Sequence, residues 1–346
     1  MENKASTAIL VKSRAKYGKR LTEKDYDSLL ACTSVSDIAA YLKANTHYSA
    51  GLENVKEAAL HRGSFEALLK GKMFRDFTDL CKFERSVGEH YFEYILLKSE
   101  IDGLIHFFRY FMAGNPQKHL MAFPDFYNRK TDISLSALAG AKSFDDVLNA
   151  LKNTRFYKLL APFRPMDGKA LDFQGVEAAL DKYLYKKSLE MFEKEFTGEE
   201  RNQLIQILSV RAELENIRKI YRAKFYYNSP PDVIRSLLNS ESRYLKKRHI
   251  DKMIGGKTAG QVIDVVKSTK YGRLTEKTPF TFIDDFAARI MFDFCRRKVR
   301  FSSYPAVVMA SVITLFDIEI ENITNIIEGR HYGVELDNIR SFLILM

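Results

Sequence analysis

Three glutamates recur in the same setting, and carboxylates are side chains that can act as general acids or bases. Glu100, Glu213 and Glu319 each open a short repeated phrase, and the three phrases are Glu100-Ile101-Asp102-Gly103-Leu104, Glu213-Leu214-Glu215-Asn216-Ile217 and Glu319-Ile320-Glu321-Asn322-Ile323. Catalysis needs one constellation of residues rather than three equal ones. The repetition therefore favours a role in helix packing, with each carboxylate satisfied by an arginine, a lysine or a helix N-terminus within its own unit. Acid–base work or a shared ring of charge stays open as the alternative.

Three residues after each glutamate, the same helix face carries Asn216 and Asn322, with Gly103 at this place in the first copy. This spacing predicts a tight polar contact. A second phrase precedes each glutamate, and its three copies are Lys43-Ala44-Asn45-Thr46-His47-Tyr48, Lys152-Asn153-Thr154-Arg155-Phe156-Tyr157 and Lys267-Ser268-Thr269-Lys270-Tyr271. We expect Thr46, Thr154 and Thr269 to close the preceding helix. The tyrosines Tyr48, Tyr157 and Tyr271 are then expected under the loop that follows.

Other patterns that could do chemistry are weak. Gly256-Lys257-Thr258 resembles the end of a phosphate-binding loop, but the glycine required five residues earlier is Asp251 and no strand is indicated. The seven histidines show neither the i,i+4 pairing of a helical metal site nor a cysteine neighbour in a ligand pattern. No nucleophile motif is present. We therefore expect no catalytic, cofactor-binding or metal-binding residues, and no small-molecule substrate.

Two phrases in fixed order, three times over, indicate one unit of about 110 residues used three times. Ser34, Ser143 and Thr258 each precede an aspartate or glutamine by three residues, which predicts the same capping box on the same helix in every unit. Proline and turn formers after residues 113 and 227 place the boundaries, so the expected domains are 1–115, 116–229 and 230–346. No segment alternates with period two. The sequence predicts an all-α protein.

Composition narrows the class of protein further. The chain has 346 residues, 46% of them hydrophobic, which is typical of a globular protein, and three cysteines too widely spaced for a metal site. No apolar run reaches the ~18–20 residues that cross a bilayer, and no secretory signal is apparent. The net charge of +10 is spread along the chain, so it does not mark a dedicated nucleic-acid module. Basic runs, which include Arg218 and Arg222 as well as Arg296, Arg297 and Lys298, are either solvated helix faces or contacts with a partner.

The repeated phrases resemble a known family. Leu/Val-Lys-x-Thr-x-Tyr, the run from Glu215 to Lys224, and Glu321-Asn322-Ile323 followed by Ile326-Ile327-Glu328-Gly329 are similar to the rotary ATPase subunit called C in bacterial and archaeal V/A-type enzymes and d in the vacuolar enzyme. The opening Val11-Lys12-Ser13-Arg14-Ala15 is similar as well. The resemblance covers the whole chain, and the first unit departs most, with Gly103 in place of asparagine.

The resemblance implies three similar helical domains in a pseudo-threefold funnel. It also implies a non-catalytic socket in the central stalk that receives the shaft subunits of D and F type and sits on the membrane proteolipid ring, at the cytoplasmic face. Such a socket would pass torque between shaft and ring during proton or sodium transport. The competing interpretation is a soluble helical-repeat scaffold that binds an acidic partner such as RNA, although units near 110 residues argue against a solenoid.

Overall fold

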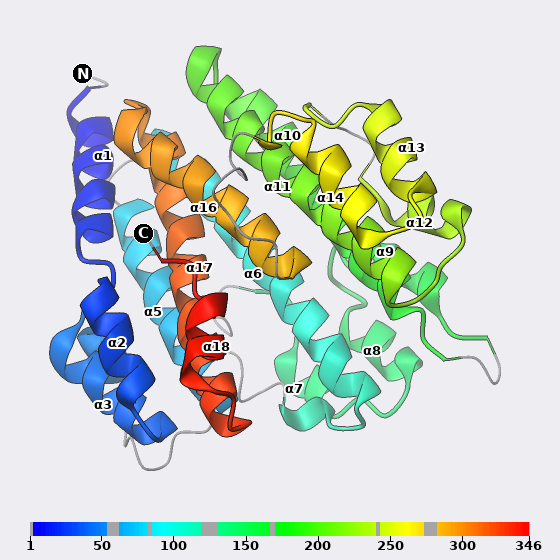
Figure 1. The fold of residues 1–346 in the computed structure, drawn as a ribbon, viewed down its shortest axis with the longest axis horizontal. Coiled ribbons are helices and arrows are strands. Elements are labelled where there is room, and N and C mark those ends of the chain that lie inside the picture. Colours follow the sequence, from blue (N-terminus) through cyan, green and yellow to red (C-terminus); the bar gives the residue numbers. More distant parts are fainter. Residues whose placement is uncertain are drawn as a thin grey trace. The chain divides into compact units, whose positions relative to one another are not determined.

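A computed structural model of the chain describes residues 3–53, 62–81, 85–118, 131–166, 170–239, 243–272 and 282–345 (Figure 1). Within these ranges the chain forms helices joined by turns, with no strand, so the prediction of an all-α protein is confirmed. The helices are α1 (Asn3–Gly18), α2 (Glu23–Ala31), α3 (Val35–Asn45), α4 (Ser49–Leu52), α5 (Arg62–Cys81), α6 (Arg85–Met112), α7 (Leu135–Ala139), α8 (Phe144–Ala150), α9 (Tyr157–Leu160), η4 (Ala161–Phe163), α10 (Phe173–Glu195), α11 (Gly198–Phe225), α12 (Pro231–Leu237), α13 (Lys247–Gly255), α14 (Ala259–Lys267), α16 (Ile283–Phe301), α17 (Pro305–His331) and α18 (Leu336–Phe342).

Contacts between Cα atoms divide the chain into two compact units. The first unit contains Met1–Val176 together with Val312–Met346, and the second contains Glu177–Ser311. In the first unit α5 packs on α6 and on α1, and α7 packs on α8. In the second unit α11 packs on α16 and also contacts α12, α13 and α14. The division into three domains and the pseudo-threefold funnel stay predictions.

The predicted capping boxes are confirmed in all three repeats. The hydroxyl of Ser34 accepts a hydrogen bond from the backbone N–H of Asp37 at the start of α3, and the Asp37 carboxylate accepts one from the N–H of Ser34. Ser143 and Asp146 form the same pair at α8, as do Thr258 and Gln261 at α14. A capping side chain satisfies N–H groups that the first helical turn leaves without partners, which fixes where each helix starts.

The three long helices that carry the glutamates also end alike. Gly114, Asn228 and Gly333 follow α6, α11 and α17 and adopt φ angles of +72°, +48° and +66°. Glycine and asparagine tolerate this left-handed conformation, which ends a helix. The turn formers that marked the predicted boundaries thus stop the helices as expected.

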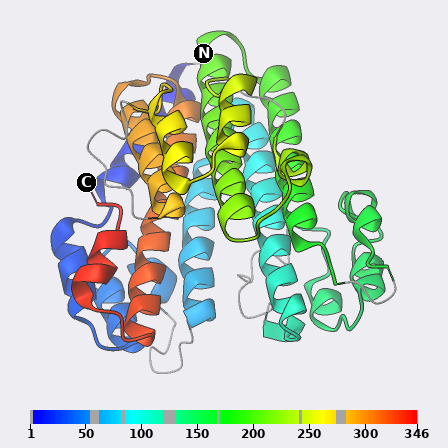
Figure 2. The ribbon, with the colours of Figure 1, turned by 45° about the vertical axis from the view of Figure 1, so that its right-hand side comes forward.

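One hydrophobic core joins the two ends of the chain within the first unit. Residues of α2 and α3 from the N-terminal segment pack with residues of α17 and α18 from the C-terminal segment. Figures 1 and 2 show these elements side by side from two directions. Tyr26, Leu29 and Ile38 contribute from one end, and Ile323 and Ile339 from the other; each is at most 5% exposed. The first repeat therefore takes part of its core from the third.

Candidate functional site

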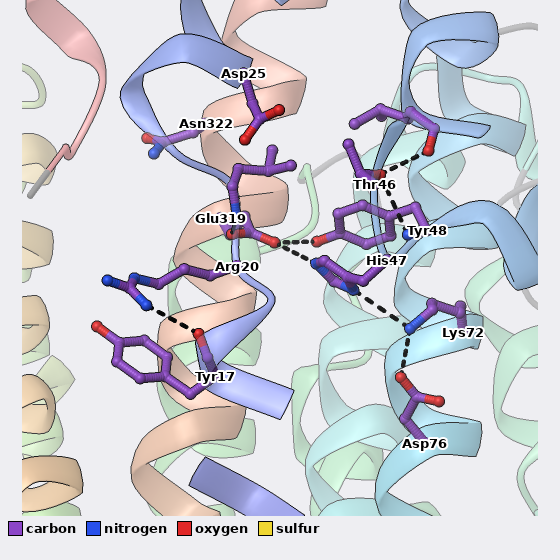
Figure 3. A network of polar contacts seen from close by, with 12 residues as sticks. Tyr17, Arg20, Asp25, Thr46, His47, Tyr48, Lys72, Asp76, Glu319 and Asn322 are labelled. Carbon is purple, nitrogen blue, oxygen red and sulfur yellow. Dashed lines mark hydrogen bonds and ion pairs between the residues drawn. The ribbon is translucent and has the colours of Figure 1, made fainter. Parts of the chain in front are cut away.

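Glu319, on α17, lies at the junction between the last repeat and the first (Figure 3). Its Oε2 accepts a hydrogen bond of 2.7 Å from the backbone N–H of Leu21, just before α2. Its Oε1 accepts one of 2.8 Å from the Tyr48 hydroxyl and lies 2.9 Å from His47 Nε2. Burial, and then the charge of Glu319, raise the pKa of Tyr48 well above its usual value, so this phenol stays a donor. One buried carboxylate thus fixes the start of α2 and the end of the α3 segment.

Glu213, on α11, occupies the equivalent place in the second unit and is fully buried. Its Oε1 accepts hydrogen bonds from the backbone N–H groups of Arg243, Tyr244 and Leu245, at 2.5, 2.6 and 3.1 Å. Its Oε2 accepts a bond from the hydroxyl of Tyr271. Burial, followed by the nearby carboxylate, raises the pKa of that phenol. The geometry matches that at Glu319, with a backbone segment on one side and a tyrosine on the other.

Glu100, on α6, has a different set of partners. The Thr131 hydroxyl donates to Oε1 at 2.8 Å, and the Arg155 guanidinium forms an ion pair with Oε2 at 3.0 Å. Burial raises the pKa of Glu100, while Thr131 and Arg155 act in the opposite direction. This junction therefore replaces the tyrosine hydroxyl with a permanent cation.

The threonines behave as predicted, but one tyrosine does not. The hydroxyls of Thr46, Thr154 and Thr269 donate to a carbonyl of the preceding helix, and each accepts a 3.2 Å bond from the N–H two residues later. In the second repeat that residue is Phe156, which is fully buried. The prediction that Tyr157 takes this place is wrong by one residue. Because Phe156 has no hydroxyl, it does not donate to Glu100, and among the described residues the hydroxyl that does so is that of Thr131.

The asparagines make the tight polar contact that their spacing predicted. Asn216 Nδ2 donates to the carbonyl of Asn239 at 3.0 Å, and Asn216 Oδ1 accepts from the N–H of Asn239 at 2.8 Å. Asn322 makes the same two bonds with Ile344, at 3.0 and 2.9 Å, and also donates to the Tyr26 hydroxyl. Each side-chain amide thus donates one hydrogen bond to the backbone of the segment that follows α12 or α18 and accepts one from it, as the backbone of an adjacent strand would.

These contacts correct the expectation that each carboxylate is satisfied within its own predicted unit. Glu100 of the first unit binds Arg155 of the second, and Glu213 of the second binds Tyr271 of the third. Glu319 of the third binds Tyr48 of the first. The contacts therefore follow a cyclic order, from the first repeat to the second, from the second to the third and from the third back to the first. The two ends of the chain contribute to the same group of packed helices.

A signal for this permutation was present in the sequence and was missed. The phrase Asp232-Val233-Ile234-Arg235 in α12 matches the phrase Asp337-Asn338-Ile339-Arg340 in α18. Arg235 pairs with Asp251 of α13, and Arg340 pairs with Asp27 at the same position of α2. The C-terminal helix α18 is thus the equivalent of α12, and the N-terminal α2 continues its repeat.

The basic residues singled out as possible partner contacts are in different environments. Arg218 and Arg222 of α11 both donate to Asp284 Oδ1 at 2.7 Å, which ties α11 to α16. Lys298 donates to Gln206 Oε1 at 2.6 Å and is half-buried. Burial lowers the pKa of Lys298. Of the five, Arg296 and Arg297 are exposed, and Arg296 forms a helical pair with Asp293.

The geometry suits attachment rather than reaction. Glu213 and Glu319 accept hydrogen bonds from backbone N–H groups and from a tyrosine hydroxyl, which fixes the segments on both sides of each carboxylate. Glu100 accepts a hydrogen bond from the Thr131 hydroxyl and forms an ion pair with Arg155. In the part of the chain that the structure describes, no group of three or more His, Cys, Asp or Glu residues could hold a metal ion. His61 and His119 lie outside that part. Among the described helices, none is long and apolar enough to cross a membrane.

Fold and contacts together define an all-helical protein of three sequence repeats, in which buried carboxylates join the end of one repeat to the beginning of the next. The family model described as ATP synthase (C/AC39) subunit matches residues 9–342. The chain therefore belongs to this family, the C/d subunits of V/A-type ATPases, and the resemblance seen in the repeated phrases is confirmed. Membership implies association with a rotary ATPase complex. A search of curated proteins finds no match.

Proposed function

We propose that this chain is the central-stalk socket of a V/A-type rotary ATPase, which couples the rotor shaft to the membrane proteolipid ring on its cytoplasmic face. The shaft would be formed by subunits of D and F type, and the chain itself would catalyse no reaction. Hydrolysis in the ATPase head would turn the shaft, the shaft would turn this protein, and the protein would turn the ring during proton or sodium transport.

The observation that carries the proposal is the cyclic order of the three junctions. A body that transmits torque must not deform where its repeats meet, and each junction is held by a buried carboxylate with donors from the next repeat. Buried hydrogen bonds to a charged group are among the stronger ones in proteins, because the low dielectric strengthens them. The junction between the two ends of the chain is built like the internal junction at Glu213, with backbone N–H groups and a tyrosine hydroxyl donating to the carboxylate.

The test uses membranes that contain the ATPase complex but lack this chain. Adding the full-length protein should restore ATP-driven ion uptake, measured with a pH-sensitive or sodium-sensitive dye, and make hydrolysis depend on transport. Uptake that is already coupled to hydrolysis without the chain would contradict the proposal. Capture from solubilised membranes supplies the second measurement. Recovery of head subunits and proteolipid supports the socket, whereas recovery of RNA or ribosomal proteins supports the scaffold alternative.

The surface that meets the ring can be tested separately. We expect the exposed pair Arg296 and Arg297 on α16 to contribute to a seat that is favoured electrostatically. The double substitution Arg296→Glu and Arg297→Glu should weaken binding to purified ring-containing membranes, with a loss that shrinks as salt is raised. Lys247→Glu with Arg248→Glu, on α13, is the matched control. Equal binding of the α16 variant and the wild type at all salt concentrations removes this pair from the interface.

A further inference from the structure

The segment that contains the short helices α13 and α14 carries much of the positive charge of this protein (Figure 1). Residues 243–272 include eight basic and two acidic residues, so their net charge is +6, whereas the whole chain has +10. The equivalent segments of the other two repeats, residues 19–49 and 131–157, each contain as many acidic as basic residues. Each predicted domain has a modest excess of its own, so this concentration appears only when equivalent segments are compared.

Hydrogen bonds to the junction glutamates show which residues of these segments are equivalent. Leu21 and Leu245 each donate a backbone N–H to such a glutamate, and each directly precedes the N-cap of a helix. In α2 the N-cap is Thr22, and the first turn contains Glu23 and Asp25. Acidic residues are favoured at this end of a helix, because the helix dipole places partial positive charge there.

The helix α13 starts with the opposite charge. The equivalents of Thr22, Glu23 and Asp25 are Lys246, Lys247 and His249, and the first turn of α13 contains no acidic residue. Burial, and then the charges of Arg248, Lys246 and Lys252, lower the pKa of His249. These cations are thus close enough to act on one imidazole and on the positive end of the helix. The start of α13 is therefore electrostatically unfavourable, although α2 shows that the fold accepts acidic residues at these positions.

Six of the eight basic residues gather where the start of α13 meets the end of α14. The Nζ of Lys270, which follows α14, lies 4.9 Å from the centre of the Tyr244 ring, which precedes α13. The rings of Tyr244 and Tyr271 are 6.0 Å apart. All six basic side chains are exposed, and we call them the basic patch: Arg243, Lys246, Lys247, Arg248, Lys267 and Lys270.

The basic patch is not neutralised by the fold. In the part of the chain that the structure describes, none of its six side chains forms an ion pair with an acidic residue. On α11, by contrast, Arg218 and Arg222 share the carboxylate of Asp284. On α12, Arg235 pairs with Asp251 of α13. The fold thus pairs the basic residues that join its helices, and the patch is available to an acidic partner.

The surroundings of the basic patch favour a protein partner over a nucleic acid or a membrane. Single-stranded nucleic acids stack their bases on exposed aromatic rings. Tyr271 is buried against Glu213, however, and Tyr244 is half-buried and accepts a hydrogen bond from Gln206. Membrane binding adds apolar side chains that insert between lipids. The described residues within 243–272 include no exposed large apolar side chain.

We propose that the basic patch binds an acidic segment of a partner protein, whose Asp and Glu side chains pair with the exposed cations. Complementary charge of this kind gives a protein interface its specificity and speeds its formation. The inference goes beyond the proposed function and does not depend on it. It also concerns residues other than Arg296 and Arg297, which are expected to contact the ring.

The first test measures binding of the full-length chain by fluorescence anisotropy. The probe is a labelled peptide made of glutamate and alanine, and the reference is the same peptide with glutamine in place of glutamate. The wild type should bind the acidic peptide more tightly, and this affinity should fall as salt is raised, because salt screens exposed charges. Equal affinity for the two peptides, or an affinity that salt does not change, overturns the proposal.

The second test copies the start of α2 into α13 with Lys246→Thr, Lys247→Glu and His249→Asp. Affinity for the acidic peptide should fall about tenfold or more at low salt, because several exposed charge pairs are lost together. The thermal unfolding temperature should not fall, because the variant gains a threonine cap and acidic residues in the first turn. Unchanged affinity overturns the proposal, as does a lower unfolding temperature with unchanged affinity, which would make the role of these cations structural.

Lys142→Thr with Lys152→Glu, at exposed positions of the equivalent segment in the second repeat, is the matched control and should bind as the wild type does. If it loses as much affinity as the α13 variant, overall charge is responsible and the proposal fails. The α13 variant is also measured with a duplex RNA and with vesicles of phosphatidylcholine and phosphatidylglycerol. Loss of either interaction with wild-type affinity for the acidic peptide would assign the patch to nucleic acid or lipid instead. Should the α13 variant not fold, the wild-type salt series still decides the question.

Discussion

Glu213→Ala is the most direct test of the statement that buried carboxylates hold the repeats together. The substitution removes the acceptor of four donors, namely the backbone N–H groups of Arg243, Tyr244 and Leu245 and the hydroxyl of Tyr271. The glutamate is fully buried, so the lost carboxylate leaves a cavity into which water has limited access. With alanine at this position, the donors that cannot reach solvent lose their acceptor and find no water to replace it, so the protein loses the full cost of burying them without a partner.

The magnitude follows from which donors stay buried. Arg243 is exposed and Tyr244 is half-buried, so their N–H groups can find water, whereas Leu245 and Tyr271 are buried. An orphaned buried donor costs about 1–3 kcal/mol, so the two together give a loss of ~4 kcal/mol. Glu213→Gln keeps a carbonyl oxygen for the backbone groups, and its loss should be about 1–2 kcal/mol.

The assay is urea unfolding followed by far-ultraviolet circular dichroism, with amide exchange of Tyr244 and Leu245 as the local measurement. Glu215→Ala is the matched control, because Glu215 lies on the same helix, has a side chain that is 33% exposed, and forms a surface pair with Arg218. Its loss should stay below about 1 kcal/mol. A Glu213→Ala protein that is as stable as the Glu215→Ala protein, with unchanged exchange at Leu245, would refute the reasoning.

Three further predictions concern single residues. Asn322→Ala should lower the free energy of unfolding by about 2–3 kcal/mol, because it leaves the buried N–H and carbonyl of Ile344 without partners. The control is Asn338→Ala at an exposed position of α18, which should change this free energy by less than about 0.5 kcal/mol. Urea unfolding measures both. Burial acts to raise the pKa of Asp284, but Arg218 and Arg222 outweigh this effect and hold the pKa below the usual 3.8. The contribution of the Asp284 carboxylate to the stability of the folded protein is therefore present above that pH, and it is lost as the pH falls through the pKa of the folded state. Asp284→Asn should therefore be less stable than the wild type at pH 7, with the difference closing in acid in a pH series of thermal unfolding. Burial raises the pKa of Glu100, so the wild type should gain stability relative to Glu100→Gln as the pH falls below that raised value; a gap that widens with rising pH instead would contradict this sign.

The sequence by itself determined the parts of this protein that depend on short-range chemistry. Capping boxes at Ser34, Ser143 and Thr258 and the turn formers after the long helices act within a few residues, so their spacing identified both helix starts and helix ends. Repetition of two phrases likewise identified the repeats and the family, because equal sequence imposes equal local structure on each copy. Helical class followed from the same periodicity.

Tertiary structure decided which repeat satisfies each carboxylate. Sequence spacing places Glu319 and Asn322 on one helix face, but it does not say which backbone segment lies against that face, and the answer is Leu21 and Ile344, from opposite ends of the chain. A one-residue difference in the second repeat also put Phe156 in place of the expected Tyr157. Long-range partners are chosen by the shared core of α2, α3, α17 and α18, which forms only when both chain ends bury their apolar faces together. The physical reason is that the free energy of burying apolar surface depends on the area removed from water and not on the order of the segments in the sequence. Segments from opposite ends of the chain can therefore complete one repeat as readily as neighbouring segments can.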